Sequence, residues 1–141
     1  DAGEYFDYPA LNRAFRLLMD GAHLVAVARN RYFQEADGLS LDMGAFVTAL
    51  EYAAGVEAVI IGKPSAGFFE SALADMDLEA SQVLMVGDDA EADVLGAIAA
   101  GLQGALVRTG KYRPGDEERL ENTTATVFRS LEELSKTLKK S

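Results

Sequence analysis

The chain has 141 residues, of which 49% are hydrophobic and 26% charged, the composition of one globular domain or of a part of one. Its net charge of −10 argues against the basic face with which proteins bind nucleic acids or anionic membranes, and it has no run of about 18 apolar residues to span a membrane. The absence of Cys excludes disulfides and thiolate sites and fits the reducing cytoplasm, where we expect the protein.

The first part of the chain predicts two amphipathic helices, one strand and an irregular segment. Apolar residues spaced three and four apart predict helices at residues 8–20 and 43–54. Residues 24–29 are typical of a strand. Residues 30–42 have no periodic pattern and predict a loop or a short hairpin.

The rest of the chain alternates strands and helices. We expect strands at residues 57–62, 83–88, 104–109 and 124–130, and helices at residues 66–76, 92–100 and 131–139. The first three of these strands are nearly all apolar, as in parallel sheets that are buried on both faces. The alternation predicts an α/β fold with a parallel sheet and right-handed crossovers. Because this type of strand begins at residue 57, we place a division of the chain near residue 55.

Three acids follow one of the buried strands. The strand runs into Gly87, then Asp88 and Asp89, and Asp93 comes one helical turn later. In open α/β sheets ligands bind beyond the carboxyl ends of the strands, and clustered carboxylates there suit Mg²⁺. Asp is also a common N-cap and first-turn residue, so helix capping stays an alternative for these acids.

A lysine follows the strand before it. The strand at residues 57–62 ends in Gly62, and Lys63 is held extended by the Pro64 that follows. A lysine at the carboxyl end of a strand can neutralise a phosphate or a carboxylate nucleophile, and the alternative is a solvated loop lysine. We expect Lys63 at the same sheet edge as Asp88, one βα unit earlier.

Together, the motif Gly62-Lys63-Pro64 and the acids Asp88, Asp89 and Asp93 resemble motifs three and four of the haloacid dehalogenase (HAD) superfamily of phosphatases. Residues 107–114 look like the end of its subfamily IIA, the NagD-type enzymes, and residues 8–16 and 42–51 look like parts of that subfamily's cap domain. The resemblance implies a HAD-like Rossmannoid parallel sheet. Residues 55–141 would form the C-terminal half of this core, and residues 1–54 part of an α/β cap.

The resemblance implies a Mg²⁺-dependent phosphatase that acts on a small phosphorylated metabolite through an aspartyl-phosphate. Lys63 would be the catalytic lysine that shields charge on the phosphoryl group. Asp88 would bind Mg²⁺ directly or through water, while Asp89 and Asp93 would bind water or orient the metal site. A homodimer through the cap is also implied.

The nucleophile of this family lies in a D-x-D motif near the N-terminus, on the first strand. The one D-x-D here is Asp75-Met76-Asp77, which follows a predicted helix and precedes a strand, so we expect a helix-terminal loop. We therefore expect the nucleophile motif to be missing and the chain to be the C-terminal part of a longer enzyme. The alternative is a non-catalytic fragment or a degenerate binding or oligomerisation module.

Two groups of cationic and aromatic residues are further candidates for substrate contacts. Residues 27–33 occupy the place where many members of the family that the chain resembles have Thr-Asn-x-Asp. Within this segment, Arg29, Arg31 and Tyr32 either contact the leaving group of the substrate or are solvated or interface residues. A basic cluster, Arg108, Lys111 and Arg113, follows the strand at residues 104–109. It either faces the phosphate entrance or pairs with the acids at residues 116–118.

Overall fold

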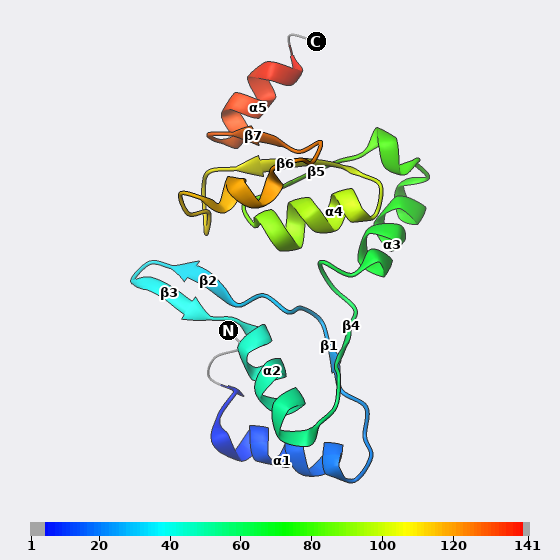
Figure 1. Cartoon of the computed structure of the whole chain (residues 1–141), viewed down its shortest axis with the longest axis vertical. Helices are drawn as coiled ribbons and strands as arrows, with labels where there is room; N and C mark the ends of the chain where they lie inside the picture. The colour runs from blue at the N-terminus through cyan, green and yellow to red at the C-terminus, as the bar shows by residue number, and fades with distance from the viewer. Residues whose placement is uncertain (1–4, 140–141) are drawn as a thin grey trace. The chain divides into compact units, whose positions relative to one another are not determined.

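A computed structural model describes residues 5–139, and the chain divides into two compact units between Gly62 and Lys63 (Figure 1). Within residues 5–139, no helix combines the length and the apolar character that crossing a membrane requires.

The first unit has two helices, a hairpin and a pair of parallel strands. Its elements are α1 (Tyr8–Met19), β1 (Val25–Ala26), β2 (Tyr32–Glu35), β3 (Gly38–Leu41), α2 (Met43–Ala54) and β4 (Val59–Ile60). Both predicted helices are present, and the irregular segment contains the short hairpin β2–β3. The predicted strands at residues 24–29 and 57–62 are shorter than expected, because only β1 and β4 form a regular ladder.

Local side chains explain where these helices begin and end. The Oδ1 atom of Asp7 accepts a hydrogen bond from the N–H of Ala10 (2.8 Å) at the start of α1. Asp42 caps α2 in the same way, through the N–H of Met43 (2.7 Å). Gly55 ends α2 in the left-handed conformation, with φ 65°, where glycine is favoured.

The pairing of β4 decides where the chain divides. We expected β4 to belong to the same sheet as the later strands, but it pairs in parallel with β1, so that Ala26 stands beside Ile60. Ala26 and Ala58 are buried against Val47 of α2 and form the core of the first unit. Of the apolar side chains around β4, those of Ala58 and Ile60 pack into this core, whereas Val59 and Ile61 are exposed, and the first compact unit extends to Gly62.

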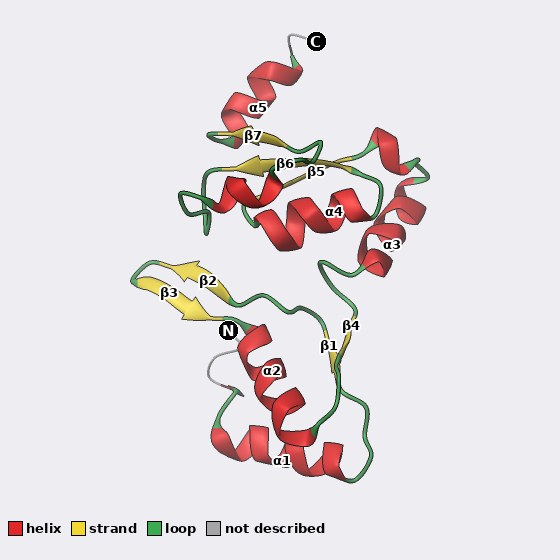
Figure 2. Ribbon diagram, in the orientation of Figure 1, coloured by secondary structure: helices red, strands yellow, loops and turns green. Residues whose placement is uncertain are grey.

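The second unit alternates strands and helical segments, as the sequence predicts (Figure 2). Its elements are α3 (Ala66–Met76), η2 (Ala80–Gln82), β5 (Leu84–Gly87), the π-helical segment η3 (Ala90–Leu95), α4 (Gly96–Ala99), β6 (Gln103–Val107), η4 (Asp116–Leu120), β7 (Thr126–Phe128) and α5 (Leu131–Leu138). The three strands form one parallel sheet in the order β5-β6-β7. Within this unit, α4 and α5 lie on opposite sides of the sheet (Figure 1).

The core of the second unit holds the crossover between β5 and β6 in place. Val94 of η3 and Leu106 of β6 are fully buried and pack together. Gly104 permits this packing, because a Cβ atom there would lie 2.8 Å from Cγ1 of Val94. The crossover starts directly after β5, so the acids that begin it lie at the carboxyl end of the sheet. Irregular π-helical turns are common near functional sites.

Candidate active site

The acidic residues lie where β5 ends and η3 begins. Gly87 is the last residue of β5, and Asp88 and Asp89 connect it to η3. Asp89 caps this segment, because its Oδ1 atom accepts hydrogen bonds from the N–H groups of Glu91 (2.9 Å) and Ala92 (3.0 Å). Asp89 therefore has the helix-capping role that the sequence offered as an alternative for these acids.

Asp93 is buried at the end of β5 and forms an ion pair with Lys63. Its side chain is only 7% exposed, and its Oδ1 atom lies 2.6 Å from Nζ of Lys63. Its Oδ2 atom accepts the N–H of Asp89 at 3.2 Å. Gly87 makes room for this carboxylate, since a Cβ atom at residue 87 would lie 2.1 Å from Oδ2 of Asp93. The buried carboxylate therefore fixes Lys63, whose removal would leave a buried charge without its partner.

Lys111 binds the other two acids from the loop that follows β6. Its Nζ atom lies 2.6 Å from Oδ2 of Asp89, and its backbone N–H donates to Oδ2 of Asp88 at 2.9 Å. Gly110 has a left-handed φ of 59°, and a Cβ atom there would lie 1.9 Å from the same oxygen of Asp88. Glycine at residue 110 thus allows the loop to close on the acids.

The Asp89–Lys111 pair keeps both of its charges despite partial burial. Burial by itself would raise the pKa of Asp89, but the hydrogen bonds from Lys111 and from the backbone outweigh it and hold the pKa below its ordinary value. Burial would likewise lower the pKa of Lys111, whereas the hydrogen bond and the charge of Asp89 raise it above its ordinary value. Both side chains are therefore ionised near neutral pH.

Lys63 lies near the acids, but not because it follows a strand of their sheet, as we expected. Our placement of Lys63 after a strand in the sheet of β5 is wrong, because that strand, β4, pairs with β1. Lys63 instead begins the second unit, and the adjoining Pro64 packs closely on the crossover. A Cβ atom at Gly96 would lie 2.9 Å from Cβ of Pro64. Packing of the chain against the crossover therefore places the lysine.

The basic cluster after β6 has divided roles. Arg108 forms an ion pair with Glu117 (2.7 Å), and the backbone N–H of Arg113 donates to Asp116 (2.7 Å), so both contact the acids at residues 116–118. Lys111 instead contacts the acids at the end of β5. The sequence predicts Lys111 only as a member of a basic cluster and not as a partner of these acids; the signal for that contact is the position of the cluster after a neighbouring parallel strand.

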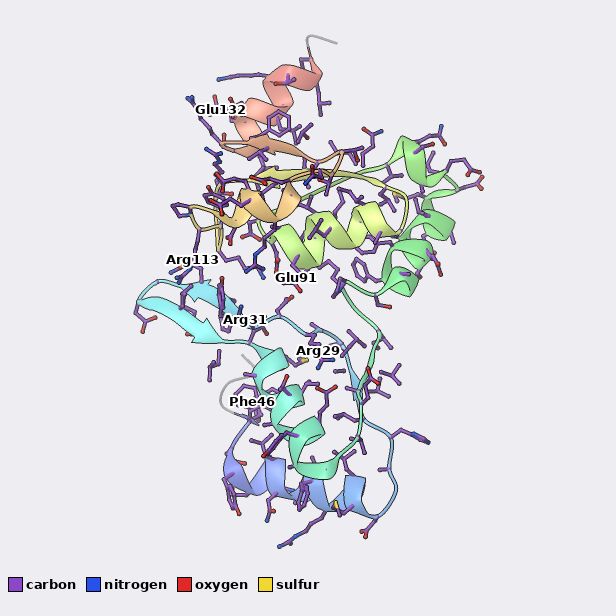
Figure 3. The ribbon with its side chains drawn as sticks, in the orientation of Figure 1. Arg29, Arg31, Phe46, Glu91, Arg113 and Glu132 are labelled. Atoms are coloured by element: carbon purple, nitrogen blue, oxygen red, sulfur yellow. The ribbon has the colours of Figure 1, made fainter. Side chains whose placement is uncertain are left out.

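The substrate-binding candidates lie in the first unit, on the segment between β1 and β2 and at the start of β2 (Figure 3). The Nη2 atom of Arg29 lies 2.6 Å from Oε2 of Glu51, whose Oε1 atom accepts the N–H of Ala58 (2.9 Å). This ion pair ties Arg29 to α2. Arg31 is exposed, and its carbonyl accepts the N–H of the residue that caps α2. Tyr32 is half-buried and begins β2.

A protein-family model described as HAD-hydrolase-like matches residues 60–134 of the chain. These residues are just over half of the chain, and they include Lys63 and the three acids. The chain belongs to the HAD-like hydrolase family. The family resemblance predicted from two short motifs is therefore confirmed.

Known relatives cover nearly the whole chain but extend well beyond it. The chain is 51% identical over 119 residues to the haloacid dehalogenase-like hydrolase domain-containing protein 2 of Rattus norvegicus, covering 84% of this chain and 46% of that protein. It is 50% identical over 123 residues to the phospholysine phosphohistidine inorganic pyrophosphate phosphatase of the same organism, covering 86% of this chain and 46% of that protein. The chain thus spans about half the length of these HAD relatives.

Solved structures of phosphatases have the same fold. The 4-nitrophenylphosphatase of Thermotoga maritima superposes with a TM-score of 0.81 at 30% identity, covering 93% of this chain and 51% of that one. The glycerol phosphate phosphatase of Mycobacterium tuberculosis, solved with magnesium, superposes with a TM-score of 0.76 at 30% identity, covering 91% of this chain and 39% of that one. The predicted α/β fold of HAD type is therefore confirmed.

The acids of this HAD chain can supply only some of the ligands of a bound cation. Within residues 5–139, no three acidic or histidine side chains converge as a metal site, because Asp89 and Asp93 are turned toward lysines. Asp88 differs, since its Oδ2 atom accepts one backbone hydrogen bond and no described residue donates to its other oxygen. Mg²⁺ commonly takes one or two carboxylates and completes its shell with water and substrate phosphate, so a single ligand from this chain is sufficient for such a site.

Proposed function

We propose that this chain is the C-terminal part of a Mg²⁺-dependent phosphatase that hydrolyses small phosphorylated metabolites through an aspartyl-phosphate. The observation that carries the proposal is the Lys63–Asp93 ion pair beside Asp88, at the carboxyl end of a parallel sheet in a HAD chain. In this proposal the first unit is part of a cap domain, and the second unit is the C-terminal half of the HAD core.

The proposed reaction has two displacements at phosphorus. A carboxylate oxygen of the nucleophile attacks phosphorus, the bond from phosphorus to the ester oxygen breaks, and the leaving oxygen takes a proton from a second Asp. Water then attacks the aspartyl-phosphate, gives a proton to that second Asp and releases inorganic phosphate. The nucleophile carboxylate is restored, so the enzyme ends as it began.

The residues of this chain supply charge and position in this reaction. Lys63 is held by Asp93, and in this proposal its ammonium group would neutralise negative charge on the phosphoryl oxygens and on the nucleophile. Asp88 would offer a carboxylate oxygen to Mg²⁺, and Asp89 caps η3 and thereby fixes the backbone next to Asp88. Bound Mg²⁺ would neutralise phosphoryl charge and orient the phosphate for attack.

We expect the nucleophile to come from a segment outside these 141 residues. Asp75 lies in the last turn of α3 and Asp77 follows that helix. A helix of 11 residues rises about 16 Å, which separates these acids from the Lys63 end of α3. Among the described strands β5 pairs only with β6, so its other edge is open to a further strand. A parallel strand there would end beside Asp88.

The proposed substrates, partners and location rest on similarity to relatives and on composition. The mammalian relative named as a phospholysine, phosphohistidine and inorganic pyrophosphate phosphatase indicates that phosphoramidates and pyrophosphate belong in a substrate panel beside phosphomonoesters. Arg29, Arg31 and Tyr32 are proposed contacts for the leaving group. A homodimer through the cap and a cytoplasmic location are further expectations, the latter from the absence of Cys.

Substitution of Lys63 tests the proposal in the full-length protein. Release of phosphate from p-nitrophenyl phosphate with Mg²⁺ is compared between wild type and Lys63→Ala, and kcat is expected to fall by about 10²–10³, the usual loss for one charged group at a transition state. Lys136→Ala is the matched control, because Lys136 is an exposed lysine that also pairs with a carboxylate, that of Glu132. Equal activity of Lys63→Ala and Lys136→Ala, or no turnover of any phosphorylated compound by wild type, would refute the proposal.

A further inference from the structure

Lys111 holds two acids of the candidate site at once, and the proposed reaction gives it no role. Its side chain is 16% exposed and that of its partner Asp89 is 20% exposed, so both members of this ion pair are largely shielded from solvent. The backbone N–H of the same residue holds Asp88. One residue therefore contacts the proposed metal ligand through its main chain and the neighbouring acid through its side chain.

The charges at the site are nearly balanced by its lysines. Three carboxylates, those of Asp88, Asp89 and Asp93, stand against the ammonium groups of Lys63 and Lys111, which leaves a net charge of −1. Each lysine forms a salt bridge with one acid. Among the described residues, Asp88 accepts a hydrogen bond only from the N–H of Lys111, although the charge of Lys111 also acts on Asp88 and Asp93. The lysines thereby decide which carboxylate is available to a cation.

We infer that Lys111 is a positioning residue that sets the Mg²⁺ affinity of the site. By pairing with Asp89 it keeps this carboxylate away from the cation, and its own positive charge opposes binding. The cation is left with Asp88 as its ligand from this chain. This inference rests on the proposed function, because it takes the Mg²⁺ site as given.

The two contacts of Lys111 can be separated by substitution. Replacing the side chain removes the charge at Asp89 but leaves the backbone N–H that holds Asp88. Met has a length and shape close to that of the lysine stem, so Lys111→Met changes mainly the charge. A purely structural role would weaken Mg²⁺ binding when the pair is broken, whereas the inferred role strengthens it.

The test is a titration of the full-length protein with MgCl2 by isothermal calorimetry, without substrate. Lys111→Met is expected to bind Mg²⁺ roughly tenfold more tightly, because one opposing charge close to a divalent ion has been removed. Asp89→Asn is expected to bind more weakly, since it leaves Lys111 unpaired. The double variant restores the net charge of −1 and is expected to return close to wild type.

The controls separate this inference from the proposed function. Lys111→Arg keeps the positive charge and should bind Mg²⁺ with the affinity of wild type. Lys136→Met removes an exposed lysine and should leave the Mg²⁺ affinity unchanged. If Lys111→Met folds poorly, the double variant is compared with Asp89→Asn instead, and the double variant is expected to bind Mg²⁺ more tightly than Asp89→Asn. Unchanged or weaker binding in these comparisons overturns the role of Lys111. Unchanged binding in Asp88→Asn would instead overturn the proposed Mg²⁺ site itself.

Discussion

Substitution of Gly87 by Ala tests whether close packing beneath the end of β5 holds Asp93 and Lys63 together. The backbone at Gly87 is extended, so alanine has no conformational penalty there, and the effect is steric. A Cβ atom would lie 2.1 Å from Oδ2 and 2.5 Å from Cβ of Asp93, both far inside van der Waals contact. Asp93 is buried and bonded to Lys63 and to the N–H of Asp89, so it cannot move without losing those bonds.

The expected cost follows from overpacking and from the loss of a charged hydrogen bond. Overpacking costs about 1–3 kcal/mol, and loss of a hydrogen bond to a charged group costs about 1.5–3 kcal/mol. A shift of Asp93 that relieves the overpacking breaks its hydrogen bonds, so the two costs do not simply add. We therefore expect the free energy of unfolding to fall by about 2–4 kcal/mol. For a protein of about 150–250 residues, a loss of this free energy of unfolding lowers the melting temperature by roughly 5–15 °C.

Thermal unfolding of the full-length protein, followed by circular dichroism, measures this effect. Gly67→Ala is the matched control, because Gly67 lies in α3 and the nearest atom to its Cβ position is Oγ of Ser65 at 3.8 Å. Alanine there should raise stability by about 0.5–1 kcal/mol through helix propensity. If Gly87→Ala has the same melting temperature as wild type, Asp93 is not as closely packed against residue 87 as the structure indicates.

Two further predictions concern ion pairs. Because the folded-state pKa of Asp89 is lowered, its contribution to stability is present above its ordinary pKa and is lost as the pH falls through the lowered value. Asp89→Asn keeps an oxygen that can cap η3 but loses the negative charge. The melting temperature of this variant should therefore lie below that of wild type at neutral pH and approach it at acidic pH. A difference in melting temperature that stays the same at every pH would contradict the stabilising Asp89–Lys111 ion pair. In the first unit, Glu51→Ala should cost about 1–3 kcal/mol, because it leaves both Arg29 and the N–H of Ala58 without a partner. Arg29→Ala, at a partly exposed arginine, should cost less than about 1 kcal/mol in the same melts, and the reverse order would refute this assignment.

Much of the local structure could be predicted from spacing in the sequence. The helices α1, α2, α3 and α5 follow the three-and-four spacing of apolar residues, and the parallel strands β5 and β6 follow their unbroken apolar runs. The acids after Gly87 were placed correctly at the end of a strand, because chain order alone puts them there. These features depend on neighbours within a few residues.

The sequence alone determined the family, the alternation of strands and helices, and the residues that begin the crossover after β5. The tertiary structure decided that β4 pairs with β1, that Asp93 folds back to Lys63, and that Lys111 divides its contacts between Asp88 and Asp89. The physical reason is that an apolar pattern indicates a segment that can pack in a sheet but does not specify which strand lies beside it. An ion pair between residues 22 or 30 positions apart depends on the packing that brings their backbones together.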